Sequence, residues 1–223
     1  VDKAGAPTGL PNLSALSVDI NEQCAPTTFS IQAFAEKCPI TPGGGPRPQT
    51  AMIGPAKYYL SQVPGLHGTF LVPGDLPTTV QSAVALIQGQ ASAGIVWDAT
   101  PKVSGADAQP AYTPRVQLAK AKGATYIYDG SNDTAFIRMR KESKAQGLDS
   151  VKIWACSLAC YTKNFIAQGG ADVEGTYMWS QFLPFEEASS NPEVQAYVTA
   201  LGSKVDSFGA QAWQAAVLFR QVI

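Results

Sequence analysis

Apolar segments alternate with segments of helical spacing along most of the chain after residue 65. The apolar segments predict strands, and each is followed by a turn and then a helix. These strands are HGTFLV (67–72), AGIVW (93–97), ATYIYDGSND (124–133, with its polar tail) and VKIWACS (151–157). This alternation predicts an α/β fold, a Rossmann-like parallel sheet with helices on both faces.

The predicted helices carry recognisable start signals and apolar faces. The segment from Pro77 to Gln90 has proline in its first turn and places Val80, Val84 and Ile87 on one face. Further helices are predicted at about 50–62, 110–122, 133–146, 192–201 and 207–223, and further extended segments at 27–34 and 174–182. The last helix is apolar on nearly every face, so we expect it to be buried.

Composition narrows the class of protein. The chain has 223 residues, of which 45% are hydrophobic and 15% charged, and its formal net charge is −1. Because Lys and Arg are scattered, a nucleic-acid groove is not expected. No apolar run approaches the roughly 20 residues of a membrane span, so direct membrane insertion is not expected either. A Pro- and Gly-rich stretch at 38–49 is the clearest linker.

The cysteines form two local pairs, Cys24 with Cys38 and Cys156 with Cys160. Two disulfides are the favoured interpretation, with reduced structural thiols and metal or redox chemistry as alternatives. A zinc site usually has a C-x2-C pair or more histidines than His67 alone, so no metal is expected. Disulfides would place the protein outside the reducing cytosol.

The order of these elements resembles the type I periplasmic binding proteins, specifically the branched-chain amino-acid type receptors of ABC importers. The resemblance is carried by the segments 56–75, 112–155, 169–187 and 206–223. The family has two Rossmann-like lobes that hold a ligand in the cleft between them. The resemblance assigns 37–183 to the second lobe, and 1–36 with 184–223 to part of the first. We expect further parts of the family fold before Val1 and after Ile223.

The resemblance implies a solute-binding component without catalysis or cofactor. Its partners would be a small polar or amphipathic molecule, such as an amino acid, and the membrane permease of an ABC transporter. Its location would be extracytoplasmic, with a lipid anchor in the full-length form. The main alternative is a ligand-sensing domain of a signalling protein with the same fold.

The resemblance also places ligand contacts in loops at the strand ends. In the segment 10–17, Ser14 and Ser17 would hold a ligand carboxylate through hydroxyl and backbone donors. In the segment 72–79, Asp75 and Thr78 stand beside a helix amino terminus. An ordinary polar loop, or a turn or capping role for Asp75, is the alternative.

The loop YDGSND (128–133) is the strongest of these candidates, because it follows a buried strand and precedes a helix. Ser131, Asn132 and Asp133 are able to hydrogen-bond a ligand, and Asp129 or Asp133 to pair with an ammonium group. The alternative is that Ser131 or Asn132 caps the helix.

Two further candidates concern the class of ligand. Amino-acid receptors of the family often carry an acidic residue where this chain has Ser157. Either Asp75, Asp129 or Asp133 supplies the missing charge, or the ligand is not a simple amino acid. Phe208 would provide an aromatic wall, with a role in the core as its alternative.

A weaker alternative is an α/β hydrolase that uses Ser157 or Cys156 as nucleophile. Such a nucleophile needs a base. The only histidine, His67, is predicted at the beginning of a strand, whereas the two candidate nucleophiles lie at the end of one. The sequence therefore disfavours catalysis.

Overall fold

The computed structural model describes residues 12–14, 28–30, 53–74 and 77–222. The chain divides into two compact units, one of residues 51–179 and one of residues 1–50 with 180–223. Each unit is described by itself. The lobe boundaries predicted from the sequence, at 36/37 and 183/184, stay a prediction.

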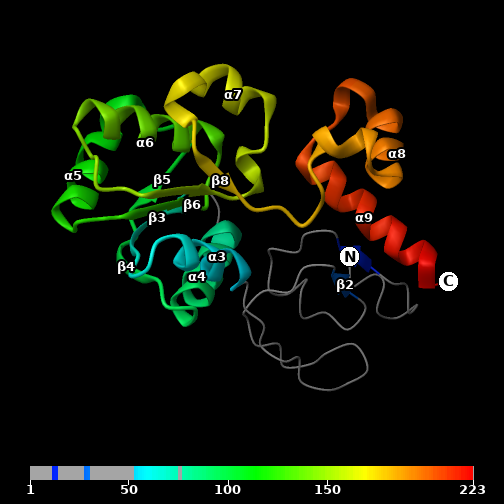
Figure 1. Ribbon diagram of the computed structural model, residues 1–223, viewed down its shortest axis with the longest axis horizontal. Coiled ribbons are helices and arrows are strands. Elements are labelled where there is room, and N and C mark those ends of the chain that lie inside the picture. The colour runs from blue at the N-terminus through cyan, green and yellow to red at the C-terminus, as the bar shows by residue number, and fades with distance from the viewer. Residues whose placement is uncertain (1–11, 15–27, 31–52, 75–76, 223) are drawn as a thin grey trace. The chain divides into compact units, whose positions relative to one another are not determined.

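The unit 51–179 contains a parallel sheet, which confirms the predicted α/β fold class (Figure 1). Its strands are β3 (His67–Pro73), β4 (Val96–Ala99), β5 (Lys102–Val103), β6 (Tyr126–Asp129), β7 (Ile153–Cys156) and β8 (Thr176–Met178). The strand order is β4-β3-β6-β7-β8, and β5 pairs with the carboxyl end of β3. All of these pairings are parallel.

Helices connect the strands and cover both faces of the sheet. They are α3 (Gly54–Gln62), α4 (Pro77–Ser92), α5 (Thr113–Ala121), α6 (Asp133–Ala145) and α7 (Lys163–Gly169), with 3-10 turns η1 (Gln109–Tyr112), η2 (Leu158–Cys160) and η3 (Gly170–Val173). Residues of α3 and α4 share one buried cluster with Phe70 and Tyr128, and residues of α5 and α6 share another with Leu71 and Ile127. Successive residues of each central strand therefore enter opposite layers.

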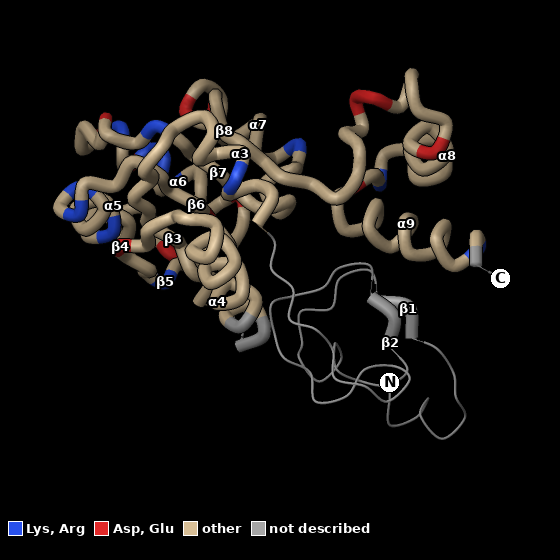
Figure 2. Tube along the Cα trace, turned by 60° about the horizontal axis from the view of Figure 1, so that its bottom comes forward, with Lys and Arg blue, Asp and Glu red and all other residues tan. Residues whose placement is uncertain are grey.

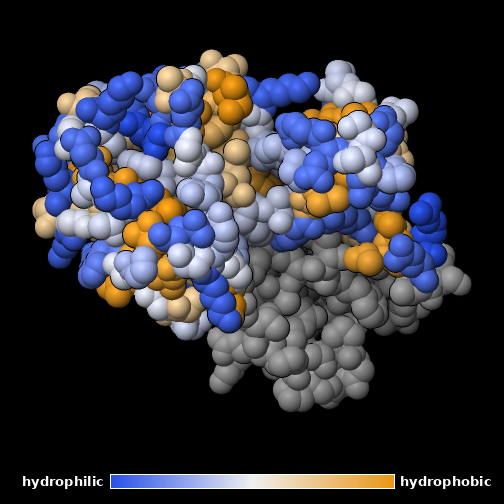
Figure 3. Space-filling view, in the orientation of Figure 1, coloured by the Kyte–Doolittle hydropathy of each residue, from blue (hydrophilic) through white to orange (hydrophobic). Residues whose placement is uncertain are grey.

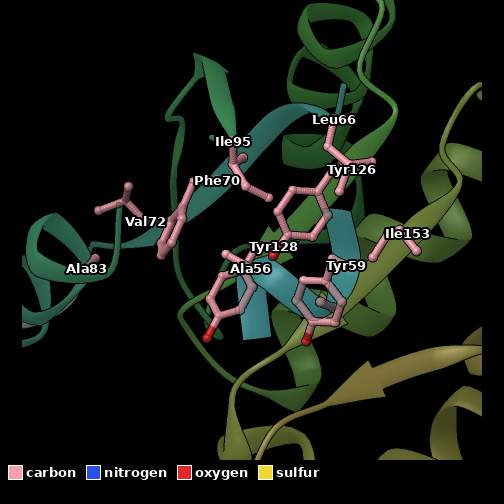
Figure 4. Packing of buried hydrophobic residues seen from close by; sticks show 11 residues of the cluster. Ala56, Tyr59, Leu66, Phe70, Val72, Ala83, Ile95, Tyr126, Tyr128 and Ile153 are labelled. Carbon is pink, nitrogen blue, oxygen red and sulfur yellow. The ribbon is translucent and has the colours of Figure 1, made fainter. Parts of the chain in front are cut away.

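The layer under α3 and α4 is aromatic, as Figure 4 shows for Tyr59, Phe70, Tyr126 and Tyr128. Phe70 and Tyr128 have ring centroids 4.9 Å apart, and those of Tyr59 and Tyr126 are 5.6 Å apart. The buried Tyr126 hydroxyl donates to Gln90 Oε1 at 2.9 Å, so its polar atom is satisfied. The outer surface is mixed in character, unlike this layer. On the face shown in Figure 3, small apolar patches lie among hydrophilic residues.

The described residues of the other unit form a short parallel strand pair and two helices. Strand β1 (Asn12–Ser14) pairs with β2 (Thr28–Ser30). Turn η4 (Phe185–Ser189) precedes α8 (Pro192–Leu201), and η5 (Gly202–Lys204) precedes α9 (Ser207–Val222). Asn191 caps α8 by accepting from the backbone N–H groups of Glu193 and Val194, both at 3.1 Å.

Helix α9 differs from its prediction. Gln211 and Ala215 are buried, but Phe208 is 55% exposed and Leu218 49% exposed. The expectation that the whole helix is buried is therefore wrong, because only one face of it packs. Its composition is apolar all round, and composition alone does not separate a packed face from an open one.

Strand β4 also differs from its prediction. It was expected over 93–97 and begins instead at Val96, because Gly94 adopts φ +110° in the preceding turn.

Glycine is required inside β3, where the Trp97 ring lies over the strand. A Cβ at Gly68 would stand 2.5 Å from two ring carbons of Trp97. That ring is held between Phe70 and Tyr126, each with its centroid 5.2 Å away.

Gly68→Ala is therefore expected to lower the free energy of unfolding by about 1 to 3 kcal/mol, because the indole must leave its packed position. Urea unfolding measures this effect. Gly54→Ala is the matched control, since no heavy atom lies within 4 Å of its added Cβ. Equal stability of the two variants would contradict this account of the layer.

Candidate functional site at the carboxyl edge of the sheet

The strand order reverses at one position of the sheet. The chain runs from β3 through α4 to its neighbour β4, and later places β6 on the other side of β3. Helix α4, after β3, covers one face, and α6, after β6, covers the opposite face. In sheets of this kind ligands bind beyond the carboxyl ends of the two strands where the order reverses. Here those strands are β3 and β6.

Backbone hydrogen bonds hold the loop after β6 against both neighbouring strands. The Gly130 N–H donates to the Leu71 carbonyl of β3 at 3.1 Å, and the Ser157 N–H after β7 donates to the Asp129 carbonyl at 3.2 Å. A Cβ at Gly130 would stand 2.8 Å from the Phe70 ring, so glycine permits this close approach. The structure thus brings the predicted loops of Ser131 and Ser157 to adjacent strand ends.

Asn132 has the capping role that the sequence left open as its alternative. Its Oδ1 accepts from the Ala135 N–H at 3.0 Å, at the start of α6. Its Nδ2 donates to Ser131 Oγ at 3.1 Å. The Asn132 side chain therefore orders the loop, and its carbonyl oxygen is engaged by the helix.

Asp133 connects the start of α6 to the start of α7. Its Oδ2 accepts from Thr162 Oγ1 at 2.8 Å and from Asn164 Nδ2 at 3.1 Å, and its Oδ1 accepts from Thr134 Oγ1 at 3.2 Å. Partial burial alone would raise the pKa of this carboxyl. The hydrogen bonds from Thr162, Asn164 and Thr134 outweigh burial, and the pKa of Asp133 is lowered.

Asp129 is fully buried, although it ends β6 at the same edge. Its Oδ1 accepts from the Ser131 N–H at 2.6 Å, whereas its Oδ2 has no hydrogen-bond partner among the described residues. Burial raises the pKa of Asp129 to about 8, helped by the charge of Asp133 and opposed by the Ser131 hydrogen bond. At neutral pH the carboxyl is mostly protonated, so it is not the counter-charge that an ammonium group would need.

Ser157 caps the turn η2 after β7, with its Oγ accepting from the Ala159 N–H at 3.3 Å. A disulfide between Cys156 and Cys160 closes this turn, and both cysteines are fully buried. The predicted pairing of Cys156 with Cys160 is confirmed. Cys24 and Cys38 lie outside the described residues.

Of the remaining predicted site residues, some lie in other elements and some lie outside the described residues. Ser14 ends β1 and pairs with Ser30. Thr78 lies in the first turn of α4. Ser17 and Asp75 are outside the described residues. Phe208 is exposed on α9, so a core role for it is not observed.

Sequence reasoning missed the loop that follows β5, which also lies at this edge. A Cβ at Gly105 would stand 2.8 Å from Asn132 Nδ2, so the two loops touch. Arg138 donates to the carbonyls of Gly105 and Asp107, and Asp107 pairs with Arg115 at 2.7 Å. Figure 2 shows that basic positions lie along α5 and α6, the helices that carry Arg115 and Arg138. Because β5 has two residues, it left no strand signal.

The arrangement that a hydrolase needs is not formed. His67 opens β3 at the amino edge, where its Nδ1 lies 3.2 Å from Asp98 Oδ2. Ser157 follows β7 at the carboxyl edge, and Cys156 is bonded to Cys160. The described part of the chain contains no cluster of three or more His, Cys, Asp or Glu suited to a metal. Within those same residues, no helix is both long and apolar enough to cross a membrane.

The fold can now be compared with known proteins. No protein-family model matches the chain, and no curated protein matches it in sequence. Solved structures do match it over nearly its whole length. A substrate-binding protein of an ABC transporter from Aeropyrum pernix has 9% identity and a TM-score of 0.70 over 97% of this chain and 54% of its own. A leucine-binding protein from Thermotoga maritima has 13% identity and a TM-score of 0.68 over 97% of this chain and 58% of its own.

A third match is a solute-binding protein from Rhodopseudomonas palustris, solved in complex with benzoate. It has 16% identity and a TM-score of 0.62 over 97% of this chain and 56% of its own. The chain has the fold of the type I periplasmic binding proteins, which confirms the fold that the sequence resemblance implied. It spans a little more than half the length of these structures.

Asp133→Asn is expected to reduce stability at pH 6 and to have a smaller effect at pH 3. A carboxyl whose folded pKa lies below its unfolded value contributes stability above that unfolded value, near 3.9, and loses it as pH falls through the folded pKa. Urea unfolding at the two pH values measures the difference. Asp149→Asn is the control, because Asp149 is exposed and accepts no hydrogen bond from described residues. A loss that is the same at both pH values would contradict the assigned hydrogen bonds.

Proposed function

We propose that this chain belongs to the extracytoplasmic solute-binding component of an ABC importer. It binds a small polar or amphipathic molecule at the carboxyl edge of the sheet, without catalysis. The observation that carries this proposal is the position of two hydroxyl-bearing loops at adjacent strand ends. The loop of Ser131 follows β6, one of the two strands at the point of strand reversal, and the loop of Ser157 after β7 is hydrogen-bonded to the Asp129 carbonyl beside it. Residues 37–183 would form one lobe, and 1–36 with 184–223 part of the other.

The hydroxyls of Ser131 and Ser157 would supply donors to the ligand. Each is half-buried, and each already accepts one hydrogen bond, from Asn132 Nδ2 and from the Ala159 N–H respectively. A hydroxyl that accepts in this way keeps its own hydrogen to donate. Two such donors at adjacent strand ends suit a carbonyl or carboxylate oxygen.

The leucine-binding and benzoate-bound neighbours suggest a ligand with a carboxylate. Leucine and benzoate share that group, and only leucine has an ammonium. If this chain binds an amino acid, the ammonium needs a counter-charge. Asp129 is mostly protonated at neutral pH, and Asp133 is charged but holds three side-chain donors, so Asp75 is the remaining candidate of the three that the sequence offered.

The membrane permease of the same transporter would be the macromolecular partner. The disulfide between Cys156 and Cys160 supports an extracytoplasmic location, because such bonds persist outside the reducing cytosol. Its position at the candidate edge would stiffen the loop that carries Ser157.

Isothermal titration against a panel of amino acids and small aromatic acids tests the proposal. Ser131→Ala and Ser157→Ala are each expected to weaken binding of the best ligand about tenfold, the cost of losing one hydrogen bond to a charged group. Ser61→Ala is the matched control. That serine lies exposed on α3 and donates to the Tyr58 carbonyl of its own helix.

If both variants bind with the affinity of the parent, the carboxyl edge is not the ligand site. If no compound of the panel gives a heat of binding, the assigned ligand class is left without support. Reduced binding by Ser61→Ala as well would indicate a general loss of structure.

A further inference from the structure

A buried carboxyl lies between the two candidate loops and has one oxygen without a partner. Asp129 is 0% exposed, and its Oδ2 accepts no hydrogen bond from any residue that the structure describes. The same residue holds both loops. Its Oδ1 accepts from the Ser131 N–H, and its backbone carbonyl accepts from the Ser157 N–H.

The groups facing Asp129 offer it no cation. From η1 it faces the Tyr112 phenol, whose hydroxyl donates instead to the Ser104 carbonyl at 3.0 Å. From the start of α6 it faces Asp133, a like charge, and the adjacent Tyr128 of its own strand enters the opposite, aromatic layer.

The neighbouring basic groups are already engaged. Arg138 donates to the carbonyls of Gly105 and Asp107, and Arg115 pairs with the carboxylate of Asp107. Among the described residues, Asp129 has no ion-pair partner.

This geometry requires a neutral side chain. A buried carboxylate with an unpartnered oxygen is far more costly than a buried neutral acid, because the full charge is desolvated. The raised pKa of Asp129, about 8, agrees with the contact geometry. The folded loop is therefore the form with a protonated Asp129.

We propose that Asp129 is a positioning residue of the ligand site, and that it holds the loops of Ser131 and Ser157 in place only while its carboxyl is protonated. When the proton leaves at alkaline pH, the charged group must reach water or a new donor. Because the Ser131 N–H alone does not offset the burial of the charge, the carboxyl then moves toward water. This movement breaks its bond from Ser131 and displaces the Asp129 carbonyl that accepts from Ser157. An effect of this loop movement on ligand binding rests on the proposed function, whereas the movement of the loops with pH does not.

The direction of the pH effect follows from proton binding. In the unfolded chain the carboxyl ionises near pH 3.9, and in the folded chain near pH 8. Between these values the folded state binds one more proton than the unfolded state, so stability falls as pH rises. Asp129→Asn keeps an oxygen for the Ser131 N–H and cannot ionise, so it lacks this dependence.

Hydrogen exchange tests the proposal without a ligand. Amide exchange at Ser131 and Ser157, corrected for intrinsic rates, is followed by NMR at pH 6.5 and pH 9. In the parent, the protection factors of both amides are expected to fall at least tenfold between these values, and in Asp129→Asn they are expected to stay constant. Asp149→Asn, an exposed carboxyl outside this loop, is the control and is expected to behave like the parent.

Protection that is constant in the parent, or that falls equally in Asp129→Asn, would overturn the proposal. The ¹³C shift of the Asp129 carboxyl provides a second measurement that does not depend on folding of a variant. A midpoint above pH 7 supports the proposal, and one near pH 4 overturns it. Because neither measurement uses a ligand, failure of the binding titrations would leave both results interpretable.

Discussion

The parallel pairing of β3 with β6 is the constraint on which the rest of this structure depends. It places residues 68–71 beside residues 126–129, although more than 50 positions separate them in the chain. Since β3 and β6 are followed by helices on opposite faces, their carboxyl ends cannot be covered by one helix. The pairing therefore produces the buried aromatic layer and places the loop of Ser131 at the point of strand reversal, and the pairing of β6 with β7 brings the loop of Ser157 beside it.

The same pairing explains why the candidate site contains a buried acid. Strand residues alternate between the two layers, so Tyr126 and Tyr128 enter the aromatic layer and Asp129 enters the opposite one. In that layer its carboxyl can bond the following turn, but the described residues offer it no cation to pair with. Asp133, four residues later, lies at the helix start and is surrounded by donors. Two carboxyls in one loop thus have pKa values displaced in opposite directions.

Much of the fold could be predicted from the sequence, because local signals and tertiary packing agree. Helix α8 has its predicted bounds, since Asn191 and Pro192 mark its start unambiguously. Strand β3 reads as a continuous apolar run because both of its faces are buried. Strand β5 could not be found, because two residues carry no periodicity and pair only through the end of β3. The exposed face of α9 was missed because composition does not say which neighbours are present.

The candidate site was predictable in position but not in detail. A polar loop after a buried strand is visible in YDGSND, and the structure places it at the reversal point of the sheet. The roles of its residues depend on distant partners. Hydrogen bonds from Thr162 and Asn164 determine the protonation of Asp133, and burial determines the protonation of Asp129. Neither influence can be read from the residues of the loop itself.

The central claim is that ligand binds at the carboxyl edge of this sheet. Backbone amide shift mapping of ¹⁵N-labelled protein, titrated with the best ligand of the panel, tests it most directly. The account predicts that the largest shifts within residues 51–179 fall at Gly130, Ser131 and Ser157. Another groove of this unit, of about 350 Å³, is lined by Arg140, Ser143 and Trp154. Shifts concentrated at that groove, with the carboxyl edge unchanged, would contradict the account.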